Sequence, residues 1–242
     1  MPRSHRPLIL AAGTRRWTRL WRWLGQQELT LLLGLVALFG GAWGFIELAE
    51  AVARQETRAL DQAVLLALRT AQDPTDPLGP KWVEELARDL TALGSVGVLG
   101  LITAGTLVYL LLAGRAAAAA FTAAAIGGGW LLMHALKFGY ARPRPALVPH
   151  ETVVYTASFP SGHAMMAAIT YLTLAAMLAR VQPHRLLRGY LLLMATTVTM
   201  LVGASRVYLG VHWPSDVLAG WTGGAAWAAL CWLLARWLTR PR

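Results

Sequence analysis

Charge is scarce in this 242-residue sequence, and cysteine is almost absent. Charged residues make up 14% of the chain, well below the quarter that is usual in soluble domains. The single cysteine, Cys231, has no partner for an intrachain disulfide, which excludes a small fold held together by disulfides. A linker rich in Pro, Gly or Ser and an internal repeat are also lacking. These absences argue for one domain.

Hydrophobic residues make up 56% of the chain. Uncharged stretches of about 17–25 residues, the length that a helix needs to cross a bilayer, recur along it. They are Leu29–Ile46, Leu90–Gly114, Ala116–Leu136, Ser161–Ala179, Gly189–Ser205 and Val217–Ala235. We therefore expect an all-α, polytopic membrane protein with six transmembrane helices. Residues 1–28 would form a basic cytoplasmic segment, and residues 29–242 the membrane domain.

Acidic residues are nearly missing from one side of these spans. If residues 1–28 are cytoplasmic, the inner segments hold 13 of the 22 basic residues and a single acid, Glu28. This excess of inner positive charge predicts cytoplasmic termini in a bacterial inner membrane, with the long loops facing the periplasm or exterior. Because the arginines flank helices and do not form one basic face, the pI near 10.8 does not indicate nucleic-acid binding.

The first outer loop, residues 47–89, contains two apolar patterns at helical spacing. One is carried by Leu60, Val64, Leu65 and Leu68, and the other by Trp82, Val83, Leu86 and Leu90. The run Asp73-Pro74-Thr75-Asp76-Pro77 separates them. We expect two amphipathic helices that lie on the membrane surface or cap the helix bundle.

The second outer loop combines cations with a helix start. Lys137, Arg142 and Arg144 follow the third span, and each arginine precedes a proline that holds the chain extended. The same loop ends in Phe159-Pro160-Ser161-Gly162-His163. Ser161 is a favoured helix cap, Gly162 allows close backbone approach, and the free N–H groups of a helix start bind anions. A histidine there can exchange protons near neutral pH.

The third outer loop places a histidine before an acid. Arg206 ends the fifth span, His212 follows six residues later, and Asp216 lies four residues beyond His212. Asp216 is thus one helical turn from His212. It can accept one imidazole N–H and leave the other nitrogen as a nucleophile. A structural capping pair remains the alternative for this spacing taken alone.

Together these residues resemble a known signature. Lys137-x6-Arg144-Pro145, Pro160-Ser161-Gly162-His163 and Ser205-Arg206-x5-His212-x3-Asp216 are similar, in order and spacing, to the three motifs of the type-2 phosphatidic acid phosphatase superfamily. Its members are integral-membrane lipid phosphate phosphatases. The resemblance implies metal-independent phosphoryl transfer without a cofactor.

The resemblance also implies a role for each motif residue. His212 would attack phosphorus and become a phosphohistidine, Asp216 would hold its tautomer, and His163 would protonate the leaving oxygen and then activate water. The phosphoryl oxygens would be held by Lys137, Arg144, Ser161, Gly162 and Arg206. Arg142 would be an accessory cation.

Several alternatives stay open from sequence alone. The ligand expected is a membrane lipid phosphate, with a polyprenyl diphosphate such as undecaprenyl diphosphate favoured over phosphatidylglycerol phosphate and phosphatidic acid. Arg142, as a second arginine, favours a diphosphate, and an Arg-rich, Ala-rich and Lys-poor composition is typical of bacteria with GC-rich genomes. Small residues near the site, Gly162, Ala164, Gly203 and Ala204, would leave room for the lipid tail. A lipid phosphotransferase and a transport or lipid-binding protein without turnover are the other candidates, and the oligomeric state is unknown.

Overall fold

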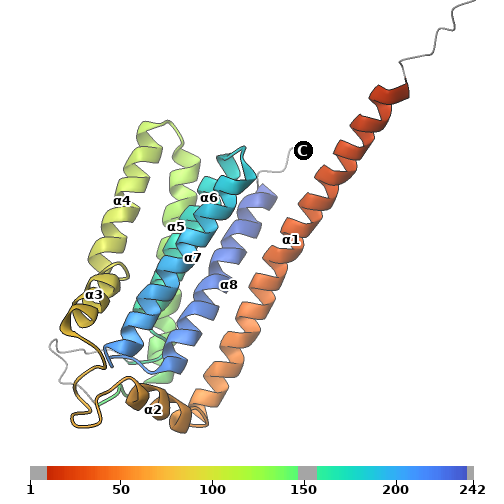
Figure 1. Ribbon diagram of the computed structural model, residues 1–242. Coiled ribbons are helices and arrows are strands. Elements are labelled where there is room, and N and C mark those ends of the chain that lie inside the picture. Colours follow the sequence, from red (N-terminus) through yellow and green to blue (C-terminus); the bar gives the residue numbers. More distant parts are fainter. Residues whose placement is uncertain (1–9, 147–156, 239–242) are drawn as a thin grey trace, which may run out of the picture.

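The computed structural model describes residues 10–146 and 157–238, with side chains from residue 28 onward. Residues 1–9 of the predicted amino-terminal segment and residues 147–156 of the second outer loop lie outside these ranges. The described chain is helical, and the all-α prediction is confirmed. Its helices are α1 Leu10–Ala53, α2 Arg58–Ala67, α3 Lys81–Ala92, α4 Val96–Leu112, α5 Ala116–Tyr140, α6 Gly162–Val181, α7 Arg185–Tyr208 and α8 Pro214–Leu238 (Figure 1).

Five helices are long and apolar enough to cross a membrane. They are the part Glu28–Ala53 of α1 together with α5, α6, α7 and α8. The helices α3 and α4 pass the same test as a pair that bends by 44° at a short break. The prediction of six spans is thus confirmed, with the second span in two pieces.

The break in the second span corrects the predicted helix Leu90–Gly114. Leu90 belongs to α3, and the chain turns before α4 starts at Val96, where the Ser95 hydroxyl accepts a hydrogen bond from the Val98 N–H at 3.2 Å. A Cβ atom at Gly94 would lie 2.4 Å from Val202 Cγ1 and 3.2 Å from the His163 carbonyl oxygen. Only glycine fits such a close approach, so the break is packed against α7 and the start of α6.

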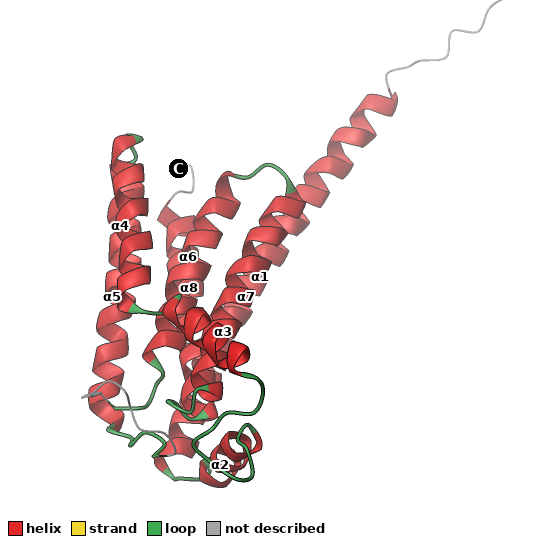
Figure 2. Ribbon diagram, turned by 60° about the vertical axis from the view of Figure 1, so that its left-hand side comes forward, coloured by secondary structure: helices red, strands yellow, loops and turns green. Residues whose placement is uncertain are grey.

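The two helices expected in the first outer loop are α2, at the lower end of the bundle in Figure 2, and α3, which is also the first piece of the bent second span. On α2, Leu60 faces away from the bundle and is 69% exposed. The buried face instead carries Leu65 and the acid Asp61, which is 2% exposed. A carboxylate buried in this way needs partners, since burying an unpaired charge costs several kcal/mol.

Helix α6 occupies the centre of the bundle and packs against α5, α7 and α8. Two glycines one turn apart on α8 allow the closest of these contacts. A Cβ at Gly220 would lie 2.9 Å from the Ser161 carbonyl oxygen, and one at Gly224 would lie 2.6 Å from Ala168 Cβ. Small residues at this spacing let membrane helices approach closely. The contact fixes the start of α6 against the start of α8.

The expectation that Gly203 leaves room for a lipid tail is wrong. A Cβ atom there would lie 2.4 Å from the indole ring of Trp221, so that ring covers the glycine. Trp221 is fixed by a hydrogen bond from its indole N–H to the Thr199 carbonyl oxygen at 3.0 Å. Gly203 therefore serves packing between α7 and α8.

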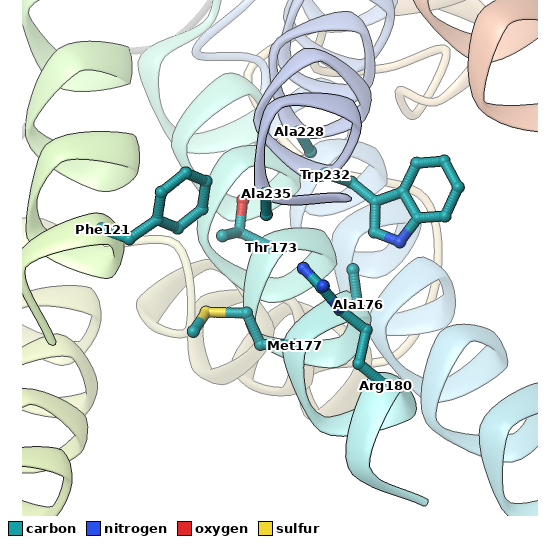
Figure 3. Close-up of a pocket in the computed structure, with 8 residues that line it drawn as sticks. All are labelled: Phe121, Thr173, Ala176, Met177, Arg180, Ala228, Trp232 and Ala235. Atoms are coloured by element: carbon teal, nitrogen blue, oxygen red, sulfur yellow. The ribbon is translucent and has the colours of Figure 1, made fainter. Parts of the chain in front are cut away.

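The two ends of the bundle differ in content. The first described residues of α1 and the last of α8 lie at the upper end in Figure 1. At the end of α6 a small pocket opens between α5, α6 and α8, lined by Phe121, Thr173, Ala176, Met177, Arg180, Ala228, Trp232 and Ala235 (Figure 3). The predicted site residues lie at the opposite end, where α5 and α7 finish and α6 and α8 begin.

Candidate active site

Four helix ends bring the three motifs together. Lys137 lies in the last turn of α5, His163 in the first turn of α6, Arg206 in the last turn of α7 and Asp216 in the first turn of α8. A backbone hydrogen bond of 3.0 Å from the Ser161 N–H to the Asp216 carbonyl oxygen joins α6 to α8. The motifs are far apart in sequence and meet in one buried region.

His212 lies between α7 and α8 and is 1% exposed. Its Nδ1 faces Asp216 Oδ2 at 3.4 Å and the Ser158 hydroxyl at 3.3 Å. Its Nε2 lies 3.0 Å from Arg144 Nη1. A guanidinium can only donate, so Nε2 is the acceptor. This arrangement favours the tautomer with the proton on Nδ1 and the lone pair on Nε2, which a nucleophilic imidazole requires.

Burial and nearby cations keep this imidazole neutral. Burial lowers the pKa of His212 well below its ordinary value of 6.5, and the charges of Arg144 and Arg206 lower it further, while the hydrogen bond with Asp216 opposes them. Burial also lowers the pKa of the Arg144 guanidinium, with Asp216 acting in the opposite direction. Cations held in a buried site favour an anionic ligand.

The Asp216 carboxylate is fully buried and held on both oxygens. Oδ2 accepts hydrogen bonds from the Ser158 hydroxyl at 2.5 Å and the Trp213 backbone N–H at 3.1 Å. Oδ1 accepts a charged hydrogen bond from Arg142 at 2.6 Å. Asp216 therefore has one fixed orientation relative to His212.

Three cations surround the two histidines. Arg206 Nη1 donates to the Thr91 hydroxyl at 3.1 Å, and Lys137 Nζ donates to the Ala157 carbonyl oxygen at 2.6 Å. Arg144 Nη1 also donates to the Val211 carbonyl oxygen at 3.0 Å. All three act electrostatically on His163. Among the described residues, Lys137 and Arg206 donate to neutral acceptors, so these bonds do not compensate the two positive charges.

Ser161 occupies the cap position of α6 but does not cap the helix with its side chain. Its hydroxyl is buried and has no hydrogen-bond partner among the described residues, and the same is true of Arg206 Nε. Buried polar groups are nearly always hydrogen-bonded, and exceptions often mark ligand sites. A Cβ atom at Gly162 would lie 3.5 Å from both Lys137 Cε and Met133 Sδ. The lysine side chain therefore packs against the start of α6.

Arg142 does not join these cations. Its guanidinium forms ion pairs with Asp216 at 2.6 Å and with Asp61 at 2.7 Å, and its side chain is only 13% exposed. The sequence suggested that Arg142 is an accessory cation for the phosphate. In the structure, it binds Asp216 instead. The cause is Asp61, whose buried position on α2 the apolar pattern did not indicate.

Several polar residues of the site were missed by the sequence interpretation. Ser158 bonds to Asp216, Thr91 accepts from Arg206, and Asp61 binds both Arg142 and Ser215. No pattern in the sequence distinguishes Asp61, Ser158 or Thr91 from other polar residues. Within the described ranges, His, Cys, Asp and Glu side chains form no group of three or more suited to a metal ion.

Comparison with known proteins identifies the family. The family model described as PAP2 superfamily matches residues 101–240, which is more than half of the chain. The chain belongs to the PAP2 superfamily. The three motifs, at residues 137–145, 160–163 and 205–216, fall inside the matched PAP2 region, and so do the helix ends that bring them together.

Individual PAP2 relatives agree with this assignment. Phosphatidylglycerophosphatase B of Bacillus subtilis (strain 168) is 31% identical over 187 residues, which cover 74% of this chain and 85% of that protein. An undecaprenyl-diphosphatase of Sulfolobus acidocaldarius is 36% identical over 88 residues, or 36% of this chain and 37% of that protein. The crystal structure of a transmembrane PAP2-type phosphatidylglycerolphosphate phosphatase from Bacillus subtilis matches with a TM-score of 0.74 and 26% identity, covering 86% of this chain and all of the other. The protein is thus a multi-span member of a family of membrane lipid phosphatases.

Proposed function

We propose that this protein hydrolyses a lipid phosphate, without a metal ion, through a phosphohistidine formed on His212. The arrangement around that side chain carries the proposal. Nδ1 faces Asp216, Nε2 faces Arg144, and buried donors of Ser161 and Arg206 lack a hydrogen-bond partner in the described part of the chain. A nucleophile with its orienting acid thus stands beside donors for the oxygens of a phosphoryl group.

In the first step, the Nε2 lone pair of His212 bonds to phosphorus as the bond from phosphorus to the leaving oxygen breaks. Arg144 then donates the N–H that had faced Nε2 to a phosphoryl oxygen as a hydrogen bond. Lys137 and Arg206 also donate hydrogen bonds to the phosphoryl oxygens. His163, which is protonated at the start of this step, gives its proton to the leaving oxygen. Asp216 accepts the Nδ1–H bond throughout and stabilises the positive charge that develops on the imidazole of His212.

In the second step, water attacks the phosphohistidine. His163, now neutral, takes a proton from that water as the new bond from oxygen to phosphorus forms. The bond between Nε2 and phosphorus breaks and its electron pair returns to His212. Inorganic phosphate leaves, and both histidines regain their starting protonation states.

The charges of the site support a mechanism without a metal ion. Phosphoryl transfer depends mainly on positioning and on stabilising negative charge, which many enzymes achieve with magnesium. Here three positive charges lie around His163, supplied by Lys137, Arg144 and Arg206. Fixed cations in a buried site are effective because they need no reorganisation during the reaction.

We also propose that the site faces the periplasm or exterior of a bacterial inner membrane. The arginine-rich segments lie at the end of the bundle where α1 begins and α8 finishes, and the site lies at the other end (Figure 1). The positive-inside rule makes the arginine-rich end cytoplasmic. The substrate headgroup would then enter from the outer leaflet.

A glycerophospholipid phosphomonoester is our first choice of substrate. The sequence argument for a diphosphate depended on Arg142, whose donors are instead directed to Asp61, Asp216, Ser215 and Thr57. The relative that aligns over most of its length is named a phosphatidylglycerophosphatase. A polyprenyl diphosphate is the second choice, supported by the shorter match to an undecaprenyl-diphosphatase.

Phosphate release by the purified full-length protein in detergent tests the proposal. The panel contains phosphatidylglycerol phosphate, phosphatidic acid, undecaprenyl phosphate and undecaprenyl diphosphate, with His212→Ala as the inactive form and His134→Ala as the control. His134 lies on α5, where its ring nitrogen pairs with the Trp130 carbonyl oxygen. We expect release that depends on His212 and is fastest with phosphatidylglycerol phosphate. If no lipid in the panel releases phosphate, the proposal is contradicted. If the phosphoryl group of a labelled substrate appears on a second lipid, the protein is a phosphotransferase.

A further inference from the structure

A buried acid from the first outer loop lies directly behind the proposed catalytic pair. Asp61, on α2, is 2% exposed. Its Oδ1 accepts the Ser215 backbone N–H at 2.9 Å, and its Oδ2 accepts the Ser215 hydroxyl at 2.6 Å. Asp61 thus holds the residue next to Asp216 by two hydrogen bonds.

Arg142 connects the two carboxylates. One nitrogen, Nη2, donates to Asp61 at 2.7 Å and to the Thr57 hydroxyl at 3.3 Å. The other, Nη1, donates to Asp216 at 2.6 Å and to the Ser215 hydroxyl at 2.8 Å. The guanidinium is planar and presents its N–H groups in a fixed fork. Holding one side of the fork on Asp61 therefore fixes the direction in which the other side meets Asp216.

The charges explain why Arg142 needs Asp61 as well as Asp216. A buried arginine with one carboxylate is free to turn until it pairs with both oxygens of that carboxylate, which is its preferred geometry. For Asp216 that pairing would compete for Oδ2, the oxygen that faces His212 Nδ1 at 3.4 Å. With Asp61 present, Arg142 bonds to Oδ1 and leaves Oδ2 to His212, Ser158 and Trp213.

We infer that Asp61 is a positioning residue for catalysis. Acting through Arg142 and Ser215, it keeps Asp216 in the orientation that directs the proton of His212 to Nδ1 and the lone pair to Nε2. The inference rests on the proposed function, because it assigns His212 as the nucleophile. It gives α2, an element outside the three motifs, a defined part in the chemical step.

A purely structural role for Asp61, such as docking α2 on the bundle, predicts something different. Loosening α2 would lower the amount of folded protein or weaken substrate binding at the outer surface. Misdirecting His212 would lower kcat and leave KM unchanged, since the Asp61 side chain bonds to Arg142 and Ser215. A role through Arg142 also predicts that the effects of the two residues are not additive.

The test uses the full-length protein in detergent and the best lipid phosphate from the panel. The variants are Asp61→Asn, Arg142→Gln and the double variant, with Asp89→Asn on the exposed face of α3 as the matched control. We expect Asp61→Asn to lower kcat and the single-turnover rate of phosphohistidine formation by about tenfold to a hundredfold, as loss of a supporting carboxylate does in other sites. KM should be unchanged, the double variant should be no slower than Arg142→Gln alone, and Asp89→Asn should match the wild type.

If Asp61→Asn does not fold, Ser215→Ala provides the test of the inference. It removes one of the two hydrogen bonds between Ser215 and Asp61. It should therefore lower kcat by a smaller factor, with KM unchanged. Wild-type kcat in the folded variant, a rise in KM alone, or additive effects in the double variant would overturn the inference. Failure of the wild-type protein to hydrolyse any lipid phosphate would instead overturn the proposed function itself, so the two failures are distinguishable.

Discussion

Arg142 and Arg144 stand two residues apart in one short segment, each followed by a proline, yet their surroundings differ sharply. Arg142 is paired with Asp61 and Asp216 at 2.7 and 2.6 Å. Arg144 donates to the Val211 carbonyl oxygen and to His212 Nε2, both at 3.0 Å. The first arginine has its charge compensated by carboxylates on the far side of Asp216. The second directs an N–H to the nitrogen that we propose as the nucleophile.

This difference shows that a cation's sequence position does not fix its role in a site. Two carboxylates around one guanidinium make a rigid support, since each N–H has a charged acceptor. Arg144 instead directs an N–H to the nitrogen that we propose as the nucleophile, next to the place where a phosphoryl group would bind. We therefore assign orientation of the nucleophile to Arg142 and phosphoryl binding to Arg144, with Lys137 and Arg206 beside it.

Removing the nucleophile should have the largest effect, because both arginine roles are defined relative to it. We expect His212→Ala to lower kcat by at least about a thousandfold and to abolish the phosphohistidine, as loss of a nucleophile does elsewhere. Acid-quenched labelling and phosphate release measure the two quantities. His134→Ala is the control and should keep wild-type activity. A labelled histidine that persists in His212→Ala would show that the nucleophile is misassigned.

Loss of one phosphoryl-binding cation should have the next largest effect. Arg206→Gln removes a charge that contacts only the Thr91 hydroxyl among the described residues, and we expect kcat/KM to fall about a hundredfold. Arg206→Lys should recover part of that loss by restoring the charge. Arg88→Gln, an exposed change on α3, is the control. Equal activity of the Gln and wild-type forms would remove Arg206 from the cation group.

The acid side of the pH profile sharpens the assignment of His212. The neutral imidazole reacts and the protonated one does not, so a lowered pKa keeps the enzyme active to lower pH. Arg144 and Arg206 lower the pKa of His212 in addition to burial, and Asp216 opposes them. With His163→Ala and a leaving group that needs no proton, we expect an unchanged rate from about pH 7 to about pH 5. A fall centred near 6.5, the ordinary value, would contradict this.

Chelation of metal ions should have no effect. If Lys137, Arg144 and Arg206 supply the positive charge, excess EDTA leaves kcat and KM as they were, while vanadate inhibits. Vanadate forms trigonal-bipyramidal adducts that resemble the transition state of phosphoryl transfer. Phosphate release with and without EDTA provides the measurement. Loss of activity that magnesium restores would show that the three cations do not suffice.

Much of the fold was predictable because hydropathy is a local property of the sequence. The lengths of the apolar segments predicted the six spans and the two helices α2 and α3. The loops that share one side of the membrane predicted which site residues meet at one end of the bundle: Lys137, Arg144, His163, His212 and Asp216. The helix break at Gly94 was not predictable, because it depends on close contacts with Val202 and His163 from other helices.

The support behind Asp216 was also beyond the sequence patterns. Asp61 is 81 residues from Arg142 and 154 residues from Ser215. Its partner is chosen by how α2 packs on the start of α8, which apolar spacing does not determine. For the same reason Arg142 looked like an accessory phosphate-binding residue, since nothing in its own segment distinguishes it from Arg144.

Competition by inorganic phosphate tests the division between the two arginines most directly. The inhibition constant of phosphate is measured for wild type, Arg142→Gln and Arg144→Gln, together with kcat for each. We expect Arg144→Gln to weaken phosphate binding by about tenfold or more, the effect of losing one hydrogen bond to a charged group. Arg142→Gln should lower kcat and leave the phosphate inhibition constant unchanged. Equal weakening of phosphate binding in both variants would place Arg142 in the phosphate site and contradict the account.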